Sequence, residues 1–451
     1  MNKKIDVLIV GAGPAGVVCA ITARKYYPSK SITVMKDIEE GVIPCGIPYM
    51  FASLKTPDEN KLGMAAMEQK NIGTAVDKAV KINREEKTVE TEKGDSYSYE
   101  KLVLAVGSNP MVLPIKGVEK QGVYQIKKDM VYLKDVINKI KQCKNVLVIG
   151  GGFIGVEFAD EVSKLKDIKV TLVEILPHLL QNSFDSEFST MVRDKLKENG
   201  VDVLTGIRVE EIMGSSRVEK VRLSNGKELP ADGIILGVGS KPNVQMAVDA
   251  GLELGTCKGI LVDEYMRTSL DSNIFAIGDC ACKRDFYTRK AIAVMLASTA
   301  TAEARIAGAN LYKIKLIREN KGTIAVYSTY IDGLVLGSAG LTEKSAESEG
   351  FETLAASVDG FDKHPASLPG AHKSKLKLIF SRQSGIILGG QVSCSISCAQ
   401  MINVIGIAIQ KRMSCTELET LQVATHPYLT SAPTMYPIIL AAQDISGKFK
   451  E

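Results

Sequence analysis

The sequence predicts an α/β protein in which two similar parallel-sheet units are followed by a smaller α+β domain. The repeated units are predicted because an apolar β-branched run twice leads into a glycine-rich turn and then a helical stretch, at residues 5–25 and 145–165. The last domain is predicted by two strand-like runs, KLKLIF and GIILGGQ, followed by an amphipathic stretch at residues 399–412. A chain of 451 residues is long enough for several domains.

The first glycine-rich turn follows a strand predicted at residues 5–10 and precedes a helix predicted at residues 17–25. In a G-x-G-x-x-G turn the first glycine permits the bend, the second lets the backbone approach a pyrophosphate, and the third allows close helix packing. The helix N-terminus then faces the phosphate charge. The stretch therefore predicts a Rossmann-like dinucleotide site. Its predicted contacts are Gly11, Gly13, Pro14, Ala15 and Gly16.

The second strand of this first unit is less regular at its end. The run at residues 31–35 is followed by Lys36 and Asp37, so a lysine stands where an acid usually meets the adenosine ribose. Lys36 is predicted as a cofactor contact, with Asp37 as the alternative acid.

The second glycine-rich turn lies between a strand at residues 145–149 and a helix at 156–165. The next strand, 169–173, ends in Glu174, about 20 residues past the glycines, where a carboxylate accepts hydrogen bonds from a ribose 2′-hydroxyl. That carboxylate would repel a 2′-phosphate, so NADH is favoured over NADPH; the alternative is a solvated strand-end acid. Two dinucleotide units in one chain predict FAD and NADH as an electron-passing pair. The predicted contacts of the second turn are Gly150, Gly152, Phe153, Ile154 and Gly155.

Three further stretches resemble the two-dinucleotide flavoprotein disulfide reductases. They are KLVLAVGSNP at residues 101–110, ADGIILGVGSKPN at 231–243 and NIFAIGDCAC at 273–282. The resemblance implies that Ala105 and Gly107 lie where the chain leaves the FAD domain, that Gly239 lies where it returns, and that Asp279 holds the flavin ribityl chain. It also implies that Phe153 covers the flavin until nicotinamide displaces it and that Glu157 lies near the nicotinamide. Packing and a helix-end acid are the alternatives for these two.

The stretch CGIPY, Cys45 to Tyr49, resembles the single-cysteine branch of that family. This branch comprises coenzyme A disulfide reductases, NADH oxidases and peroxidases, and NADH-dependent persulfide or polysulfide reductases. A helix beginning at Ile47 would stabilise a Cys45 thiolate. The resemblance implies that Cys45 takes an electron pair from the flavin, while the second atom comes from substrate as a coenzyme A sulfur, a persulfide sulfur or a sulfenic oxygen. The alternative is a buried thiol used in packing.

Two positions depart from the coenzyme A enzymes. Pro44 replaces the asparagine common before that cysteine, and Leu368 stands where those enzymes carry a tyrosine before Pro-Gly. The identity of the substrate therefore does not follow from the resemblance alone.

The stretch VATHPYLTSAP, residues 423–433, resembles the interface segment of the same family. The resemblance implies a homodimer in which His426 serves as acid-base at the partner's active site. Ser431 or Ala432 stands where the two-cysteine enzymes carry a glutamate that orients this histidine. Tyr428 is the alternative, since coenzyme A disulfide reductases use tyrosines from the partner subunit.

The same resemblance divides the chain into four segments. Residues 1–112 and 246–320 are predicted as the two parts of the FAD-binding domain, 113–245 as the NAD-binding domain, and 321–451 as the dimerisation domain.

Composition limits the function classes. A net charge of +4 with 24% charged residues does not indicate a nucleic-acid surface, and no run reaches the 18 to 20 apolar residues of a membrane span. Nine cysteines in a chain of this length indicate a reducing compartment, predicted as the cytoplasm, in which most cysteines other than Cys45 are buried thiols. Cys394 and Cys398 would share a helix face if residues from Ser393 were helical, and no metal site is predicted.

The leading hypothesis is an FAD-dependent NADH oxidoreductase that reduces a small disulfide, persulfide or polysulfide through Cys45, with coenzyme A among the candidate carriers. The first alternative is an NADH oxidase or peroxidase that cycles through a cysteine sulfenic acid. The second is a flavoprotein that hands electrons to a protein partner, with Cys45 incidental.

Overall fold

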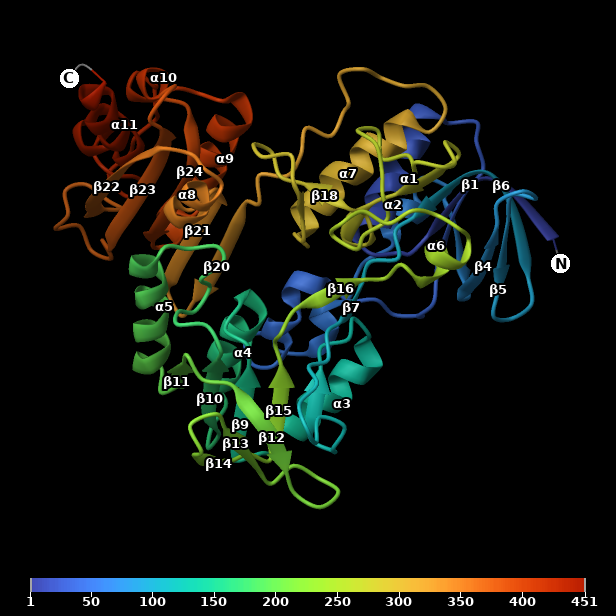
Figure 1. Cartoon of the computed structure of the whole chain (residues 1–451), viewed down its shortest axis with the longest axis horizontal. Helices are drawn as coiled ribbons and strands as arrows, with labels where there is room; N and C mark the ends of the chain where they lie inside the picture. The colour runs from blue at the N-terminus through green and yellow to red at the C-terminus, as the bar shows by residue number, and fades with distance from the viewer. Residues whose placement is uncertain (1, 450–451) are drawn as a thin grey trace. The chain divides into compact units, whose positions relative to one another are not determined.

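The computed structural model describes residues 2–449 (Figure 1). Contacts divide the chain into two compact units. The first runs to Met111 and resumes over Gln125–Lys139 and Gly239–Thr323; the second holds Val112–Tyr124, Ile140–Val238 and the chain from Ile324 onward. The four-segment division predicted from the sequence stays a prediction.

The first unit is built on a mixed sheet of strand order β3-β2-β1-β6-β5-β4, with β17 beside β6. Its strands are β1 (Asn2–Val10), β2 (Ile32–Lys36), β3 (Gly73–Val76), β4 (Ala79–Asn83), β5 (Thr88–Thr91), β6 (Ser96–Leu104) and β17 (Ile274–Ala276). Strand β1 pairs in parallel with β2 and β6, and β17 pairs in parallel with β6. The carboxyl ends of these strands therefore meet at one edge, where nucleotides bind in such sheets.

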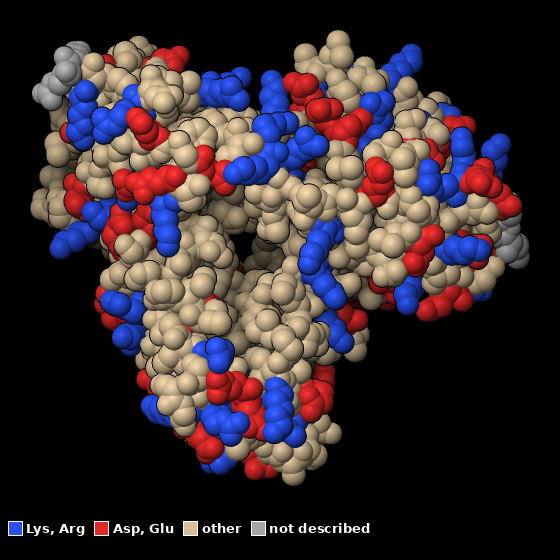
Figure 2. Space-filling model, in the orientation of Figure 1, with Lys and Arg blue, Asp and Glu red and all other residues tan. Residues whose placement is uncertain are grey.

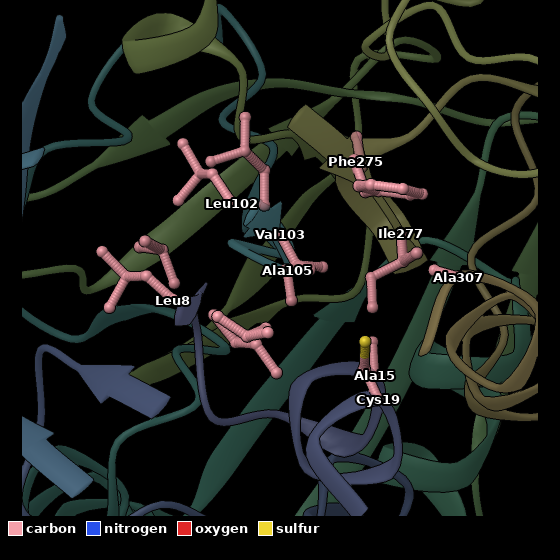
Figure 3. Packing of buried hydrophobic residues seen from close by; sticks show 14 of the residues in the cluster. Leu8, Ala15, Cys19, Leu102, Val103, Ala105, Phe275, Ile277 and Ala307 are labelled. Carbon is pink, nitrogen blue, oxygen red and sulfur yellow. The ribbon is translucent and has the colours of Figure 1, made fainter. Parts of the chain in front are cut away.

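Helices α1 (Pro14–Tyr26) and α7 (Ala297–Asn310) pack against each other in this unit. A Cβ at Gly308 would lie 2.8 Å from the carbonyl oxygen of Cys19, so only glycine allows this approach. In Figure 3 the sulfur of Cys19 points toward Ile277 of the same core cluster. Burial raises the pKa of the Cys19 thiol to about 12, as expected of a packing residue.

The remaining elements of the first unit are short. They are α2 (Ala65–Glu68), α6 (Gln245–Asp249), the pair β7 (Ser108–Pro110) and β16 (Ser240–Pro242), the pair β18 (Lys283–Arg284) and β19 (Ala291–Ile292), and most of α3 (Met130–Ile140).

The second unit begins with a sheet of order β11-β10-β9-β15-β8 and an antiparallel sheet β12-β13-β14. Their bounds are β8 (Val123–Gln125), β9 (Asn145–Ile149), β10 (Lys169–Glu174), β11 (Asp202–Thr205), β12 (Val209–Met213), β13 (Lys220–Leu223), β14 (Glu228–Pro230) and β15 (Gly233–Leu236), with helices α4 (Phe153–Ser163) and α5 (Ser186–Glu198). Strand β9 pairs in parallel with β10 and β15, as β1 does with β2 and β6. The predicted repeat of one strand-turn-helix-strand design is confirmed.

The same unit ends in an antiparallel sheet of order β20-β21-β24-β23-β22. Its elements are β20 (Tyr327–Ile331), β21 (Leu334–Gly340), β22 (Thr353–Phe361), β23 (Lys373–Ser381), β24 (Ile387–Cys394), α8 (Glu343–Ser348), α9 (Met401–Lys411), α10 (Cys415–Glu419) and α11 (Pro437–Lys448). Helix α9 packs on β21 and β24, and α11 packs on β22 and β23. The predicted α+β domain is confirmed.

A buried lysine ties this antiparallel sheet to α5. The Lys377 ammonium lies 3.0 Å from the Asp185 and Glu187 carboxylates and 2.7 Å from Glu343. The Gln391 amide also donates to Asp185, at 2.6 Å. Burial lowers the pKa of Lys377, but the hydrogen bonds to the three carboxylates outweigh it and raise the pKa, so this buried lysine stays charged.

The structure corrects two interpretations of the cysteines. Cys394 ends strand β24 and the next turn is a 3₁₀ helix at Ile396–Cys398, so the condition under which Cys394 and Cys398 would share a helix face is not met. Cys394 is disulfide-bonded, and the side chain of Cys398 lies outside the described part of the structure. The sequence led us to expect that most other cysteines are buried thiols. Cys257 and Cys282 instead form a disulfide.

The surface carries both signs of charge. Acidic and basic side chains lie interspersed on the face of the molecule in Figure 2, consistent with 56 basic and 52 acidic residues in the sequence. Within residues 2–449, no helix combines the length and the apolar character needed to cross a bilayer.

Candidate active site

The first glycine turn, residues 11–16, forms an open cradle at the end of β1. Gly11 has φ +110°, and a Cβ there would lie 2.2 Å from the carbonyl oxygen of Ala105. A Cβ at Gly16 would lie 1.9 Å from the carbonyl oxygen of Gly11. By contrast, a Cβ at Gly13 would meet no described atom within 4 Å. The open position lies just before Pro14 and Ala15, where α1 presents its N-terminal amides, so a pyrophosphate fits this turn.

The second glycine turn, residues 150–155, has the same design. Gly150 has φ +107°, and a Cβ there would lie 2.6 Å from the carbonyl oxygen of Gly237. A Cβ at Gly155 would lie 1.7 Å from the carbonyl oxygen of Gly150, whereas one at Gly152 would meet no described atom within 4 Å. Helix α4 begins directly after Gly152, and Ile154 in the first turn of this helix is 37% exposed. This turn also fits a dinucleotide pyrophosphate.

The acid predicted at the second turn lies beside it. Glu174 is 8% exposed, and its carboxylate accepts hydrogen bonds from the amides of Gly151 and of Leu176, the latter at 2.7 Å. The corresponding position of the first unit differs, because the Lys36 ammonium donates to the carbonyl oxygen of Glu39 at 2.6 Å. Glu174 therefore contacts the second glycine turn directly, whereas Lys36 is engaged by its own loop.

Asp279 lies in a turn at the end of β17. Gly278 before it has φ +71°, a left-handed conformation that glycine adopts without strain. The Ser108 hydroxyl donates to the Asp279 carboxylate at 2.7 Å, and the Lys128 ammonium lies 3.3 Å from it. Sequence reasoning missed Ser108 and Lys128, although Ser108 directly follows Gly107 in the AVGSNP motif.

A buried ion pair supports the Asp279 turn. The Gly278 amide donates to Glu303 at 2.7 Å, and the Lys283 ammonium donates to the Gly278 carbonyl oxygen at 2.5 Å. Lys283 and Glu303 are 3% and 2% exposed and lie 3.5 Å apart. Burial raises the pKa of Glu303, and the nearby Lys283 opposes that shift. The signal for Glu303 in the sequence is a lone acid inside the small-residue stretch STATAEARIAGAN.

Cys45 lies in a 3₁₀ turn, Pro44–Gly46, that is followed by a second 3₁₀ turn at Pro48–Met50. The expected helix beginning at Ile47 is therefore wrong, since the chain forms two short 3₁₀ turns in its place. The buried Asn60 amide donates to the Ile43 carbonyl oxygen at 3.0 Å and clamps this segment. A Cβ at Gly46 would lie 1.9 Å from the Asn60 side-chain oxygen.

Exposure separates Cys45 from the other thiols. Cys19, Cys143, Cys280 and Cys415 are buried, whereas Cys45 is exposed. Burial raises the pKa of Cys280 to about 11 and also raises that of Cys143. The alternative of a buried Cys45 used in packing is therefore excluded.

Glu157 and Phe153 lie on the face of α4 that meets β20. Burial raises the pKa of Glu157 to about 7, and the Thr329 hydroxyl, which donates to the carboxylate at 2.8 Å, opposes the shift. The Phe153 ring stacks on Tyr327 with centroids 4.9 Å apart and an interplanar angle of 16°. Both helix residues therefore contact strand β20, and the roles predicted for them beside flavin and nicotinamide stay predictions.

His426 and Tyr428 lie in an exposed segment between α10 and α11. The Tyr428 amide donates to Nδ1 of His426 at 3.3 Å, and 52% of Tyr428 is exposed. His364 braces the segment, since its amide donates to the Pro427 carbonyl oxygen at 3.0 Å. Ser431 donates to the Phe361 carbonyl oxygen at 2.6 Å. These residues belong to the second unit and Cys45 to the first, so their roles stay predictions.

Comparisons with known proteins agree with this geometry. Residues 5–304 match the pyridine nucleotide-disulphide oxidoreductase family, and residues 326–436 match its dimerisation domain. The chain is 29% identical to an NADH oxidase of Methanocaldococcus jannaschii over 98% of each protein. It is 30% identical to an NAD(P)H coenzyme A polysulfide/persulfide reductase of Pyrococcus horikoshii, over 87% of this chain and 88% of that protein.

Among solved structures, an NAD-dependent persulfide reductase from A. fulgidus superposes with a TM-score of 0.91 at 30% identity, covering all of this chain and 84% of that one. The predicted family and the predicted FAD and NAD(P)H cofactors are confirmed. The chain therefore belongs to the pyridine nucleotide-disulphide oxidoreductase family and is an FAD-dependent NAD(P)H oxidoreductase.

Proposed function

We propose that this chain reduces a small disulfide, persulfide or polysulfide with electrons from NADH, through Cys45. The observation that carries the proposal is the exposure of Cys45 in its 3₁₀ turn, whereas the thiols of Cys19, Cys143, Cys280 and Cys415 are buried. The relatives named above, one a coenzyme A polysulfide/persulfide reductase and one a persulfide reductase, support this substrate class. Free coenzyme A, glutathione or inorganic polysulfide would carry the sulfur.

The two glycine turns would hold the cofactors. Gly11 to Gly16, with Asp279 on the ribityl chain, would hold FAD, and Gly150 to Gly155, with Glu174 on the ribose, would hold NADH. FAD, when bound, supplies the transfer of an electron pair from NADH to sulfur. Asp279 is kept in place for this role by Ser108 and Lys128.

Cys45 would do the sulfur chemistry. Its thiolate attacks one sulfur of the substrate, the sulfur–sulfur bond breaks, and a mixed disulfide with Cys45 remains while the other half leaves as a thiolate. A proton for that leaving thiolate would come from His426 or Tyr428 of a second copy. Two electrons that originate in NADH would then cleave the mixed disulfide, so that the Cys45 thiolate is restored and the second half of the substrate leaves as a thiolate.

A homodimer in the cytoplasm is part of the proposal. It is supported by the match to a dimerisation domain and by the exposed side chains of Ile396, Ile407 and Leu429, which are 69%, 58% and 59% exposed.

The test is an anaerobic NADH titration of the purified flavoprotein, followed by absorbance. The wild type is expected to develop a long-wavelength charge-transfer band that Cys45→Ser lacks, and Cys415→Ser, which alters a buried cysteine, serves as the control. Oxidised coenzyme A and polysulfide are then compared as acceptors. Identical titrations of wild type and Cys45→Ser would overturn the proposal.

A second candidate is an NADH oxidase, which is favoured by the Methanocaldococcus jannaschii relative of that name. It predicts NADH consumption that needs only oxygen, with Cys45 cycling through sulfenic acid. The ratio of the rate with air alone to the rate with polysulfide under argon separates the two candidates.

A further inference from the structure

A disulfide lies a few residues from the predicted flavin contact. Cys257 and Cys282 are bonded across 25 residues of sequence, with Cα atoms 5.9 Å apart. Cys257 lies at the tip of a tight hairpin, in which the Gly255 amide donates to the Gly259 carbonyl oxygen at 2.8 Å. Cys282 follows Asp279 by three positions. The bond therefore joins a surface hairpin to the segment that carries Asp279.

Backbone contacts hold the two cysteines side by side independently of the sulfur bond. The Ile260 amide donates to the Cys280 carbonyl oxygen at 2.8 Å, and the Cys282 amide donates to the Ile260 carbonyl oxygen at 2.8 Å. A Cβ at Gly259 would lie 2.7 Å from the Cys282 amide nitrogen, so the chains touch. The Cα separation lies within the range that a disulfide spans without backbone movement. The pair can therefore open and close in place.

Solvent exposure differs between the bonded pair and Cys280, which precedes Cys282 by two positions. Cys257 and Cys282 are both partly exposed. Cys280 is 0% exposed, and its thiol donates to the Leu104 carbonyl oxygen at 3.3 Å. Because thiolate attack requires access to a sulfur atom, the partly exposed pair is the candidate for attack by a small thiol, whereas the buried Cys280 is not.

The segment that contains Cys282 is linked to the Asp279 turn through Lys283. The buried Lys283 ammonium donates to the carbonyl oxygens of Gly278 at 2.5 Å and Ala281 at 3.1 Å. Lys283, the residue after Cys282, thus contacts Gly278, the residue before Asp279. Cys282 is therefore joined through Lys283 and Gly278 to the predicted flavin contact, Asp279.

We propose that Cys257 and Cys282 form a second redox site, a surface disulfide that small thiols open and small disulfides re-form, and whose state sets how firmly the Asp279 turn holds flavin. A thiolate attacks one sulfur of the disulfide, the cysteine–cysteine bond breaks, and a mixed disulfide forms. A second thiol displaces the first, so that one disulfide and two thiols become two cysteine thiols and one small disulfide. The reverse reaction restores the bond. Neither Cys45 nor NADH takes part, so the site goes beyond the proposed function.

The first experiment uses the full-length flavoprotein with Cys45→Ser, so that its result does not depend on Cys45. The protein is equilibrated with mixtures of reduced and oxidised glutathione, quenched in acid, alkylated with N-ethylmaleimide and mapped by mass spectrometry. The peptides that contain Cys257 and Cys282 are expected to be linked at high oxidised glutathione and separately alkylated at high reduced glutathione. Failure to link at any ratio, or a link that resists excess glutathione in the folded protein, overturns the proposal.

The second experiment measures the rate of flavin loss by fluorescence after dilution. Reduced glutathione is expected to raise this rate several-fold in the Cys45→Ser protein. The rate in a protein that also carries Cys257→Ser and Cys282→Ser should be high with or without glutathione, whereas Cys415→Ser should behave as the parent does. Equal rates in all of these proteins would overturn the link between the disulfide and flavin retention.

Discussion

The first and second glycine turns have nearly the same backbone conformation. Gly11 and Gly150 have φ values of +110° and +107°. In both turns the third glycine presses against the carbonyl oxygen of the first, at 1.9 Å for a Cβ on Gly16 and 1.7 Å for one on Gly155. Each turn opens a helix that lacks a side-chain cap, so its N-terminal amides face the open position.

The two turns differ in the side chain that ends the next strand. The Glu174 carboxylate accepts from the Gly151 amide inside the second turn, whereas Lys36 donates away from the first turn to Glu39. Backbone geometry therefore makes a pyrophosphate site in both places. Which dinucleotide each one holds depends on side chains outside the turn.

The largest expected effect comes from filling each turn. Gly16→Val should yield protein without flavin, whereas Gly155→Val should stay yellow and lose about 100-fold or more in kcat/KM for NADH, since displacement of a bound reactant by an ångström costs that much. Flavin content by absorbance and NADH kinetics measure the two effects. Gly447→Ala, at an open position of α11, is the control. If both valine variants lose the same cofactor, the assignment of one cofactor to each turn is wrong.

The next effect concerns the buried carboxylates that support the turns. Glu303 has a buried cationic partner in Lys283, so Glu303→Leu should lower the free energy of unfolding by about 3–5 kcal/mol, because it leaves that cation uncompensated. Urea unfolding followed by flavin fluorescence measures it. The double variant Lys283→Met/Glu303→Leu should recover most of the loss. A double variant as unstable as the single one would contradict a charge-based cause.

Glu157, near the second turn, has a neutral partner and should respond to pH. Its pKa is raised from 4.5 to about 7 by burial, so the folded state binds more protons than the unfolded state between these pH values. The free energy of unfolding should therefore fall as pH rises from about 4.5 to about 7, by up to about 3 kcal/mol in total. Glu157→Gln should remove this slope, measured as urea midpoints at several pH values. Glu198→Gln, at an exposed acid, should keep it.

The smallest effect is expected at Glu174. Glu174→Gln keeps the shape of the side chain and removes its charge, so KM for NADH should rise about tenfold, the value of one hydrogen bond to a charged group. The preference for NADH over NADPH should narrow, because a 2′-phosphate is no longer repelled. Steady-state kinetics with both nucleotides measure this. An unchanged preference would show that another residue selects the nucleotide.

Much of the candidate site was predictable because its chemistry is encoded locally. A strand, a glycine turn and a helix follow one another in sequence at residues 5–25 and 145–165. This local pattern predicts two nucleotide-binding units without any long-range information. The signal for Cys45 is also local, because the stretch CGIPY contains it. The helix expected after it failed because tertiary contacts, here the clamp from Asn60, set the conformation of a proline-rich segment.

By itself the sequence determined the α/β class, the two glycine turns, the position of Glu174 at a strand end and the lone Cys45 between prolines, since each depends on neighbours within a few residues. Only the tertiary structure decided which groups support them. Thr329 reaches Glu157 across 172 positions, Cys282 meets Cys257 across 25, and Lys283 meets Glu303 inside the core. The physical reason is that a buried polar group needs a partner from wherever the fold places one, and no periodicity in the chain records that choice.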